Sequence, residues 1–205
     1  DDSHTIGYLR ITQFSESVPK KVEEALQELK EKEVEGLILD LRNNSGGLVS
    51  SGIAVSDSLL SERPVVETKN RNGIKDAIIS QKETSFDGPM VTLVNKGTAS
   101  ASEILAGSLQ DNGRSILMGE KTYGKGLIQS LKSLGNDSGI AITVASYITP
   151  KGNNIQGLGM TPDKLLDLRD ASEYGSADDK WVRNAELFLD SLLEKEEVSI
   201  QNIEP

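Results

Sequence analysis

Apolar and polar positions along this chain follow two different periods, and their succession predicts an α/β domain. Short apolar runs typical of buried strands are separated by longer segments in which apolar residues recur every three or four positions, as on one face of a helix. The predicted order is strand, helix, strand, helix, hairpin, strand, helix, strand, which favours a largely parallel sheet. The strands are Ile6–Gln13, Leu37–Leu41, Val91–Val94 and Ser115–Met118, the helices Pro19–Glu33, Leu48–Leu60 and Ile104–Gln110, and the hairpin Pro64–Lys69 with Ile74–Ser80.

Two more elements are predicted towards the C-terminus. Ser130–Leu134 and Ile140–Tyr147 flank a Gly-containing turn, and apolar residues alternate in the second run, as in a hairpin. Asp178–Glu194 has helical spacing, and such an apolar face more often docks on its own domain than on a partner. We therefore expect a core over residues 5–165, a linker over 166–177, and a C-terminal helix with a tail over 178–205.

The stretch Val91–Gln129 is the best candidate for a reactive site. It runs from an apolar strand through a Gly-containing turn into a helix whose first residues are small. A serine at such a turn can expose its hydroxyl beside the free N–H groups and partial positive charge of the helix N-terminus, which makes Ser100 a candidate nucleophile. Two alternatives stay open: Ser100 and Glu103 also fit a capping box, and Ser102 is a rival nucleophile.

The inventory of side chains limits how such a serine could be activated. The 205 residues include no cysteine, which excludes thiolate nucleophiles and thiolate metal sites, and the one histidine, His4, lies near the terminus. The base would then be a lysine, as in Ser-Lys enzymes, and Lys125 between two glycines is the best candidate. A lysine serves only if burial or a cationic neighbour lowers its pKa, and by composition alone Lys125 would be a solvated surface residue.

The net charge of the chain limits its classes of partner, and its N-terminus bears on its location. The formal net charge of −10 argues against nucleic acid and against anionic membrane surfaces. The chain contains neither a signal segment nor an apolar run long enough to span a bilayer. It begins Asp1-Asp2-Ser3 without methionine, as expected of a fragment or a mature form, so these observations leave the compartment open.

A Gly-Gly turn follows the predicted buried strand that ends at Leu41. In Arg42–Gly47, backbone N–H groups could converge on an anion, although an ordinary strand-to-helix loop has the same composition. Phosphate is a weaker candidate for that anion, because the chain has neither a P-loop nor a dinucleotide-binding fingerprint.

Three segments together resemble the C-terminal processing peptidases, the tail-specific serine proteases. They are LDLRNNSGG (39–47), TASASEILAGSLQDN (98–112) and TYGKGLIQ (122–129), and they occur in the family's order and spacing. The resemblance covers Thr5 to Leu165. It implies a ClpP/crotonase-like α/β core with a mostly parallel sheet and flanking helices. It also implies a PDZ domain in the full-length protein, for which this chain has no room.

The resemblance also assigns roles to individual positions. It selects Ser100 over Ser102 as the nucleophile, makes Lys125 the general base, and has Gln129 hold the lysine. The oxyanion hole would be formed by the backbone N–H groups of Ala101 and, from the Gly-Gly turn, Gly46. Of the nearby acids, we interpret Glu103 as structural and Glu120 as exposed, since an acid close to the lysine would oppose its role as base.

The function implied is a serine endopeptidase that uses a Ser-Lys dyad to cleave near the C-terminus of protein substrates through an acyl-enzyme. Such chemistry needs no metal or cofactor. The expected partners are proteins with apolar C-terminal tails, with self-association possible, and the expected location is exported: periplasm, thylakoid lumen or cell envelope. Two alternatives remain: a non-catalytic peptide-binding fragment, and a crotonase-like acyl-CoA enzyme that uses the oxyanion hole without the Ser100–Lys125 pair.

Overall fold

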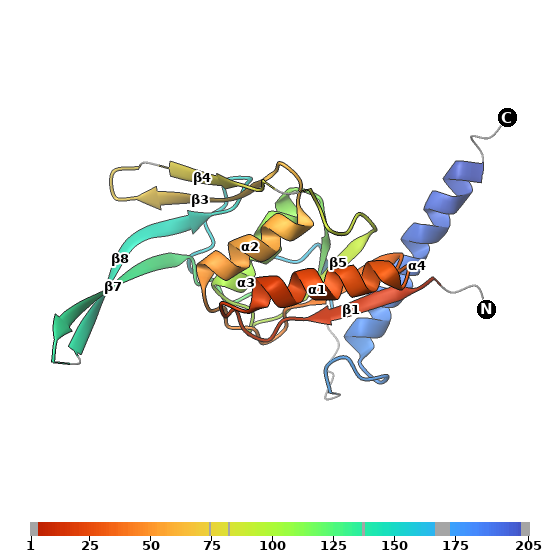
Figure 1. Cartoon of the computed structure of the whole chain (residues 1–205), viewed down its shortest axis with the longest axis horizontal. Coiled ribbons are helices and arrows are strands. Elements are labelled where there is room, and N and C mark those ends of the chain that lie inside the picture. The colour runs from red at the N-terminus through yellow and green to blue at the C-terminus, as the bar shows by residue number, and fades with distance from the viewer. Residues whose placement is uncertain (1–3, 74, 82, 137, 167–172, 202–205) are drawn as a thin grey trace.

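The computed structural model describes residues 4–73, 75–81, 83–136, 138–166 and 173–201, and this part of the chain forms two sheets and four helices (Figure 1). The larger sheet has the strand order β1-β2-β5-β6-β9, and every neighbouring pair in it is parallel. Its α/β architecture confirms the predicted class. Its strands are β1 (Ile6–Arg10), β2 (Gly36–Asp40), β5 (Met90–Val94), β6 (Ile116–Gly119) and β9 (Lys164–Leu165).

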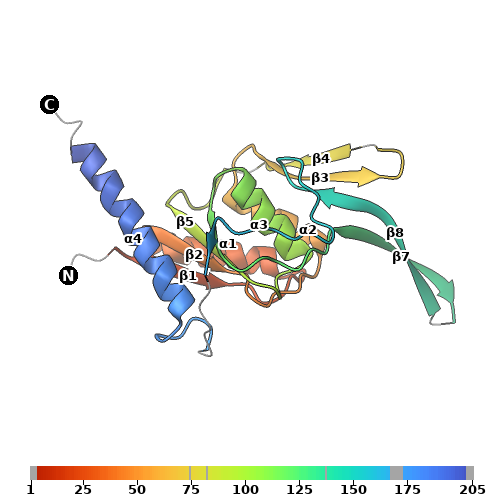
Figure 2. The same cartoon turned by 180° about the vertical axis from the view of Figure 1, so that it is seen from behind.

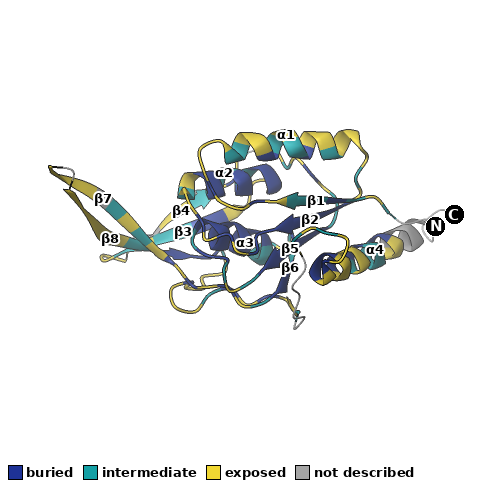
Figure 3. Ribbon diagram, turned by 90° about the horizontal axis from the view of Figure 1, so that it is seen from below, coloured by how far each residue is buried: buried dark blue, intermediate teal, exposed yellow. Residues whose placement is uncertain are grey.

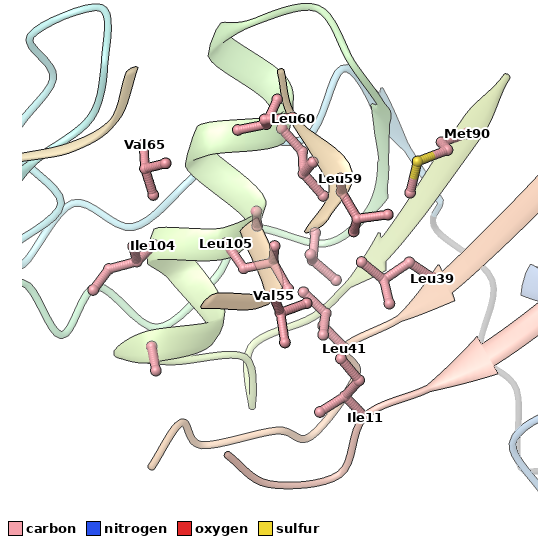
Figure 4. Close-up of a cluster of buried hydrophobic side chains, with 14 of the residues drawn as sticks. Ile11, Leu39, Leu41, Val55, Leu59, Leu60, Val65, Met90, Ile104 and Leu105 are labelled. Carbon is pink, nitrogen blue, oxygen red and sulfur yellow. The ribbon is translucent and has the colours of Figure 1, made fainter. Parts of the chain in front are cut away.

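Helices cover both faces of this sheet. On one face α1 (Val18–Glu31), α2 (Val49–Leu59) and α3 (Ala101–Asp111) bury their apolar residues against Leu37 and Leu39 of β2. Figure 4 shows part of this cluster, and Figure 3 shows the buried strands between the helices. All five residues of β2 are buried, which is why the run Leu37–Leu39 within it is continuously apolar rather than alternating.

The other face is covered by α4 (Lys180–Gln201), seen from behind in Figure 2. Its buried residues pack against Ile38, Val91, Leu93 and Met118, so the prediction that the C-terminal helix docks on its own domain is confirmed. Leu187 points away from this contact and is 69% exposed. No helix in the described part of the chain is both long and apolar enough to cross a membrane.

The second sheet is antiparallel and has the strand order β4-β3-β8-β7. Both predicted hairpins are present in it, and the hairpin of β7 and β8 extends far from the body of the molecule (Figure 1). Its strands are β3 (Pro64–Asn70), β4 (Lys75–Ile79), β7 (Leu127–Gly135) and β8 (Ser138–Ile148).

Two features of the C-terminal region, a short strand and the linker, were not fully predicted from the sequence. The two-residue strand β9 was not predicted, because so short an element has no period. Half of the predicted linker over 166–177, residues 167–172, lies outside the described part. Its described end is not free of the core, since Tyr174 lies 4.2 Å from the guanidinium carbon of Arg42.

Candidate active site

Ser100 lies at the sharp turn between β5 and α3. Its backbone has φ 58° and ψ −119°, a region that residues other than glycine rarely adopt and that stores strain. It is also the N-cap of α3, and its N–H donates to Glu103 at 3.0 Å, as in a capping box. The cap and the strained turn therefore coexist at one residue, whose side chain lines a pocket.

Ser102, the rival candidate, is fully buried. Its hydroxyl donates to the backbone carbonyl of Asn44 at 3.0 Å, which ties the start of α3 to the Gly-Gly turn. Ser102 is not among the residues that line the pocket of Ser100. Ser102 therefore contributes packing and a hydrogen bond to the structure.

Glu103 joins the nucleophile turn to the lysine segment. Its carboxylate is fully buried and accepts hydrogen bonds from three backbone N–H groups: Ser100 at 3.0 Å, Gly124 at 2.7 Å and Lys125 at 2.8 Å. The hydroxyl of Thr122 donates to it at 2.5 Å. Hydrogen bonds to an ionised acceptor are the strong ones, so Glu103 fixes both backbones relative to each other, in agreement with its predicted structural role.

Ser100, Lys125 and Gln129 line one pocket of about 460 Å³. Lys125 lies two residues before β7 and Gln129 lies within that strand, so these two residues, 25 and 29 positions after Ser100, meet it here. Both side chains are exposed, whereas Ser100 is half-buried. The other residues lining the pocket are mainly apolar: Val49, Ile53, Thr68, Ile78, Leu127, Ile128 and Tyr147.

The electrostatics of this pocket are simple. Lys125 is the one charged residue among the described residues that line it. Burial raises the pKa of Tyr147 to about 12, so its phenol stays neutral. Glu120, expected to be exposed, is half-buried and pairs with the exposed Lys96 at 3.3 Å. No carboxylate is therefore among the described residues that line the pocket with Lys125.

The Gly-Gly turn packs directly against Ser100. A Cβ added to Gly46, whose φ is +101°, would lie 2.7 Å from the Cβ of Ser100 and 3.1 Å from the nitrogen of Ala101. The Ala101 N–H starts α3 and meets no acceptor in the described part of the chain. The Gly46 N–H, in contrast, donates to the Asn44 side chain at 2.9 Å, which the sequence did not predict.

Asn44 is a site residue that sequence reasoning missed. It is fully buried, and its side-chain amide donates to the backbone carbonyl of Ile11 at 2.8 Å. Its backbone carbonyl accepts hydrogen bonds from Ala99 N–H and Ser102 Oγ at 3.0 Å each. Thus Asn44 links the Gly-Gly turn both to the end of β1 and to the nucleophile turn. An asparagine four residues after the end of β2, inside the Gly-Gly turn motif, was the available signal.

A strained serine and a lysine line one pocket, and the neighbouring helix N-terminal N–H of Ala101 meets no acceptor among the described residues. Such an arrangement is the kind of site that acyl-transfer enzymes with a serine nucleophile use. Residues 5–166 match the model of peptidase family S41. The chain therefore belongs to this family.

Named relatives agree with this assignment. The chain is 51% identical over 170 residues to a carboxyl-terminal-processing protease of Synechocystis sp. (82% of this chain, 40% of the relative). It is 44% identical over 164 residues to a chloroplastic C-terminal processing peptidase of Tetradesmus obliquus (79% and 35%). The solved photosystem II D1 C-terminal processing protease is 42% identical with a TM-score of 0.75 (79% and 42%). The chain thus spans about two fifths of these relatives' length.

Proposed function

We propose that this protein is a serine endopeptidase that cleaves near the C-terminus of protein substrates, with Ser100 and Lys125 as its catalytic dyad. The observation that carries the proposal is the strained turn that holds Ser100 on the wall of the pocket that Lys125 also lines. Membership of peptidase family S41 supports the same reaction class.

The reaction follows from the groups in the pocket. Neutral Lys125 takes the proton of Ser100 Oγ while that oxygen bonds to the scissile carbonyl carbon. The protonated lysine then donates to the leaving amine as the C–N bond breaks, which leaves an acyl-enzyme. In the second half, Lys125 removes a proton from water as the water oxygen attacks the ester carbon. The bond from that carbon to Ser100 Oγ then breaks, and Lys125 returns the proton to Oγ. Gln129, from the same wall, would orient the lysine amine.

The developing oxyanion needs donors beside Ser100. The Ala101 N–H, which meets no acceptor among the described residues, supplies one, and such a donor contributes about 3–4 kcal/mol to transition-state stabilisation. The Gly46 N–H supplies the second donor. To do so it either breaks its hydrogen bond to the Asn44 side-chain oxygen or donates to that oxygen and to the oxyanion at the same time. The contact that a Gly46 Cβ would make with Ser100 supports this role, because it brings the turn's backbone next to the reacting centre.

Lys125 acts as a base only in its neutral form, yet its side chain is exposed. We infer that the bound substrate covers the pocket and removes water from the amine, which disfavours its charged form. The apolar wall of the pocket supports this inference and favours an apolar substrate side chain near the scissile bond.

The substrates we propose are proteins with apolar C-terminal tails, bound extended, with a PDZ domain of the full-length protein delivering them. Relatives named chloroplastic and relatives from bacteria support an exported location, in the periplasm, thylakoid lumen or cell envelope. Self-association belongs to the same proposal and is testable by sedimentation.

The test is cleavage of an unstructured protein with an apolar tail by the parent chain, Ser100→Ala, Lys125→Ala and, as a control, Lys121→Ala on the exposed part of the same segment. The proposal expects turnover by the parent and the control only. Tail binding without turnover, and without labelling of Ser100 by a fluorophosphonate, would instead identify a peptide-binding fragment. Hydrolysis of an acyl-CoA that survives Ser100→Ala would identify a crotonase-like enzyme.

A further inference from the structure

The residues just before Gly46 are held by a segment from the other end of the chain. Arg42 is 2% exposed, and its guanidinium donates to the carboxylates of both Asp40, with a shortest distance of 2.6 Å, and Asp179, at 2.6 and 3.0 Å. Asp40 ends β2, whereas Asp179 lies 137 positions after Arg42 and outside the segment matched to the family. The buried arginine thus connects the Gly-Gly turn to the C-terminal segment.

Asp179 is itself fixed by the start of α4. One carboxylate oxygen accepts the N–H groups of Trp181 at 3.0 Å and Val182 at 3.2 Å, as an N-cap does, and the other accepts Gly175 N–H at 2.8 Å. Trp181 and Val182 are buried against the sheet. The docking of α4 therefore determines where the carboxylate that holds Arg42 lies.

A second contact reaches the next residue of the turn. The Asn43 side-chain amide donates to the hydroxyl of Tyr174 at 2.9 Å, and the Tyr174 ring covers Arg42. On its other side Asn43 exchanges two hydrogen bonds, both 2.9 Å, with the side chain of Asn95, which directly follows β5 and precedes the nucleophile turn. Asn43, with φ 56°, is thus bound between the C-terminal segment and the nucleophile strand.

We propose that Asp179 and Tyr174 are positioning residues for the oxyanion-binding turn, acting through Arg42 and Asn43 on Gly46. The proposal rests on the proposed function. Removing one carboxylate from the buried arginine leaves its charge partly uncompensated, and the turn relaxes because Arg42 and Asn43 are the residues that anchor it to the C-terminal segment. A small displacement of Gly46 lowers the rate without weakening substrate binding.

The first test is the isosteric variant Asp179→Asn, with Glu186→Gln on the exposed side of α4 as its control. We expect kcat to fall about 10- to 100-fold with KM unchanged. A peptide aldehyde, which forms a tetrahedral adduct with Ser100, should lose affinity by a similar factor, whereas a product peptide should bind as before. A loss confined to thermal stability, with kcat and aldehyde affinity unchanged in the folded variant, would overturn the proposal.

A second measurement does not depend on turnover. Hydrogen exchange followed by mass spectrometry should become faster in residues 42–47 of Asp179→Asn than in the parent or Glu186→Gln. Tyr174→Phe keeps the ring and removes only the hydroxyl, so its effect on exchange in the same peptide should be smaller. It replaces Asp179→Asn as the test variant if Asp179→Asn does not fold. Unchanged exchange in the turn of both variants would refute the positioning role. An inactive parent whose turn nevertheless responds would refute the proposed protease activity but not the coupling.

Discussion

The carboxylate of Glu103 accepts a hydrogen bond from the backbone N–H of Lys125 at 2.8 Å, through the same oxygen that accepts the N–H of Ser100 at 3.0 Å. One buried atom therefore sets the spacing of the two proposed catalytic residues. Because Glu103 lies on the first turn of α3, the helix itself carries this reference point.

We predict that Glu103→Gln impairs both stability and activity. The amide NH₂ would face backbone donors, so at least one buried N–H loses its acceptor, at a cost of about 1–3 kcal/mol in the free energy of unfolding. Turnover should fall at least about tenfold. Urea unfolding and tail cleavage measure the two effects. Glu120→Gln, which loses only a pair with exposed Lys96, is the control and should change stability by less than about 1 kcal/mol.

We predict that Gly46→Ala nearly abolishes cleavage. A Cβ there would lie 2.7 Å from the Ser100 Cβ and 2.8 Å from the Ala99 oxygen, on a backbone with φ +101°. The turn must move away from Ser100, and kcat should fall about 100-fold or more. Gly113→Ala is the matched control: its φ is +67°, but a Cβ meets nothing within 4 Å. It should cost about 1–2 kcal/mol of stability from strain and leave kcat unchanged, and equal losses in the two variants would contradict the argument.

The ion pair between Arg42 and Asp179 should make the free energy of unfolding depend on pH in a defined direction. Burial alone raises the pKa of Asp179, but hydrogen bonds from Arg42 and from Gly175 N–H outweigh it and lower that pKa below its ordinary value of 3.8. The folded state therefore binds a proton less readily than the unfolded state. The resulting stabilisation is complete above the unfolded-state pKa and is lost as the pH falls through the folded-state pKa.

It follows that the free energy of unfolding should differ between the parent and Asp179→Asn by a constant amount from about pH 7 to about pH 5, and that this difference should shrink at lower pH. Urea titrations at several pH values measure it. Glu186→Gln, on the exposed face of α4, provides the baseline. A difference that grows on acidification would show that the sign is wrong.

How far the sequence could predict this molecule depends on the range of the interaction. The apolar run Leu37–Leu41 predicted a strand buried on both faces, and β2 is one, because burial leaves a local pattern. The resemblance to the C-terminal processing peptidases implied that Ser100, Lys125 and Gln129 share a site, and all three line one pocket. The bond from Arg42 to Asp179 and the Asn44 oxygen on Gly46 N–H could not be predicted. Pairs of polar residues distant in sequence, and side-chain rotamers in a turn, have no period that a sequence can display.

The role of Lys125 as a base, rather than as a positive charge, is tested by Lys125→Arg. A guanidinium keeps the charge but stays protonated at every accessible pH, so it cannot take the Ser100 proton. We expect turnover to fall about 10²- to 10⁴-fold, as in Lys125→Ala, while a product peptide still binds. Lys121→Arg, at an exposed position of the same segment, should behave as the parent. Retention of more than a tenth of parental turnover by Lys125→Arg would mean that the lysine acts through its charge and that another group, or the substrate, removes the proton.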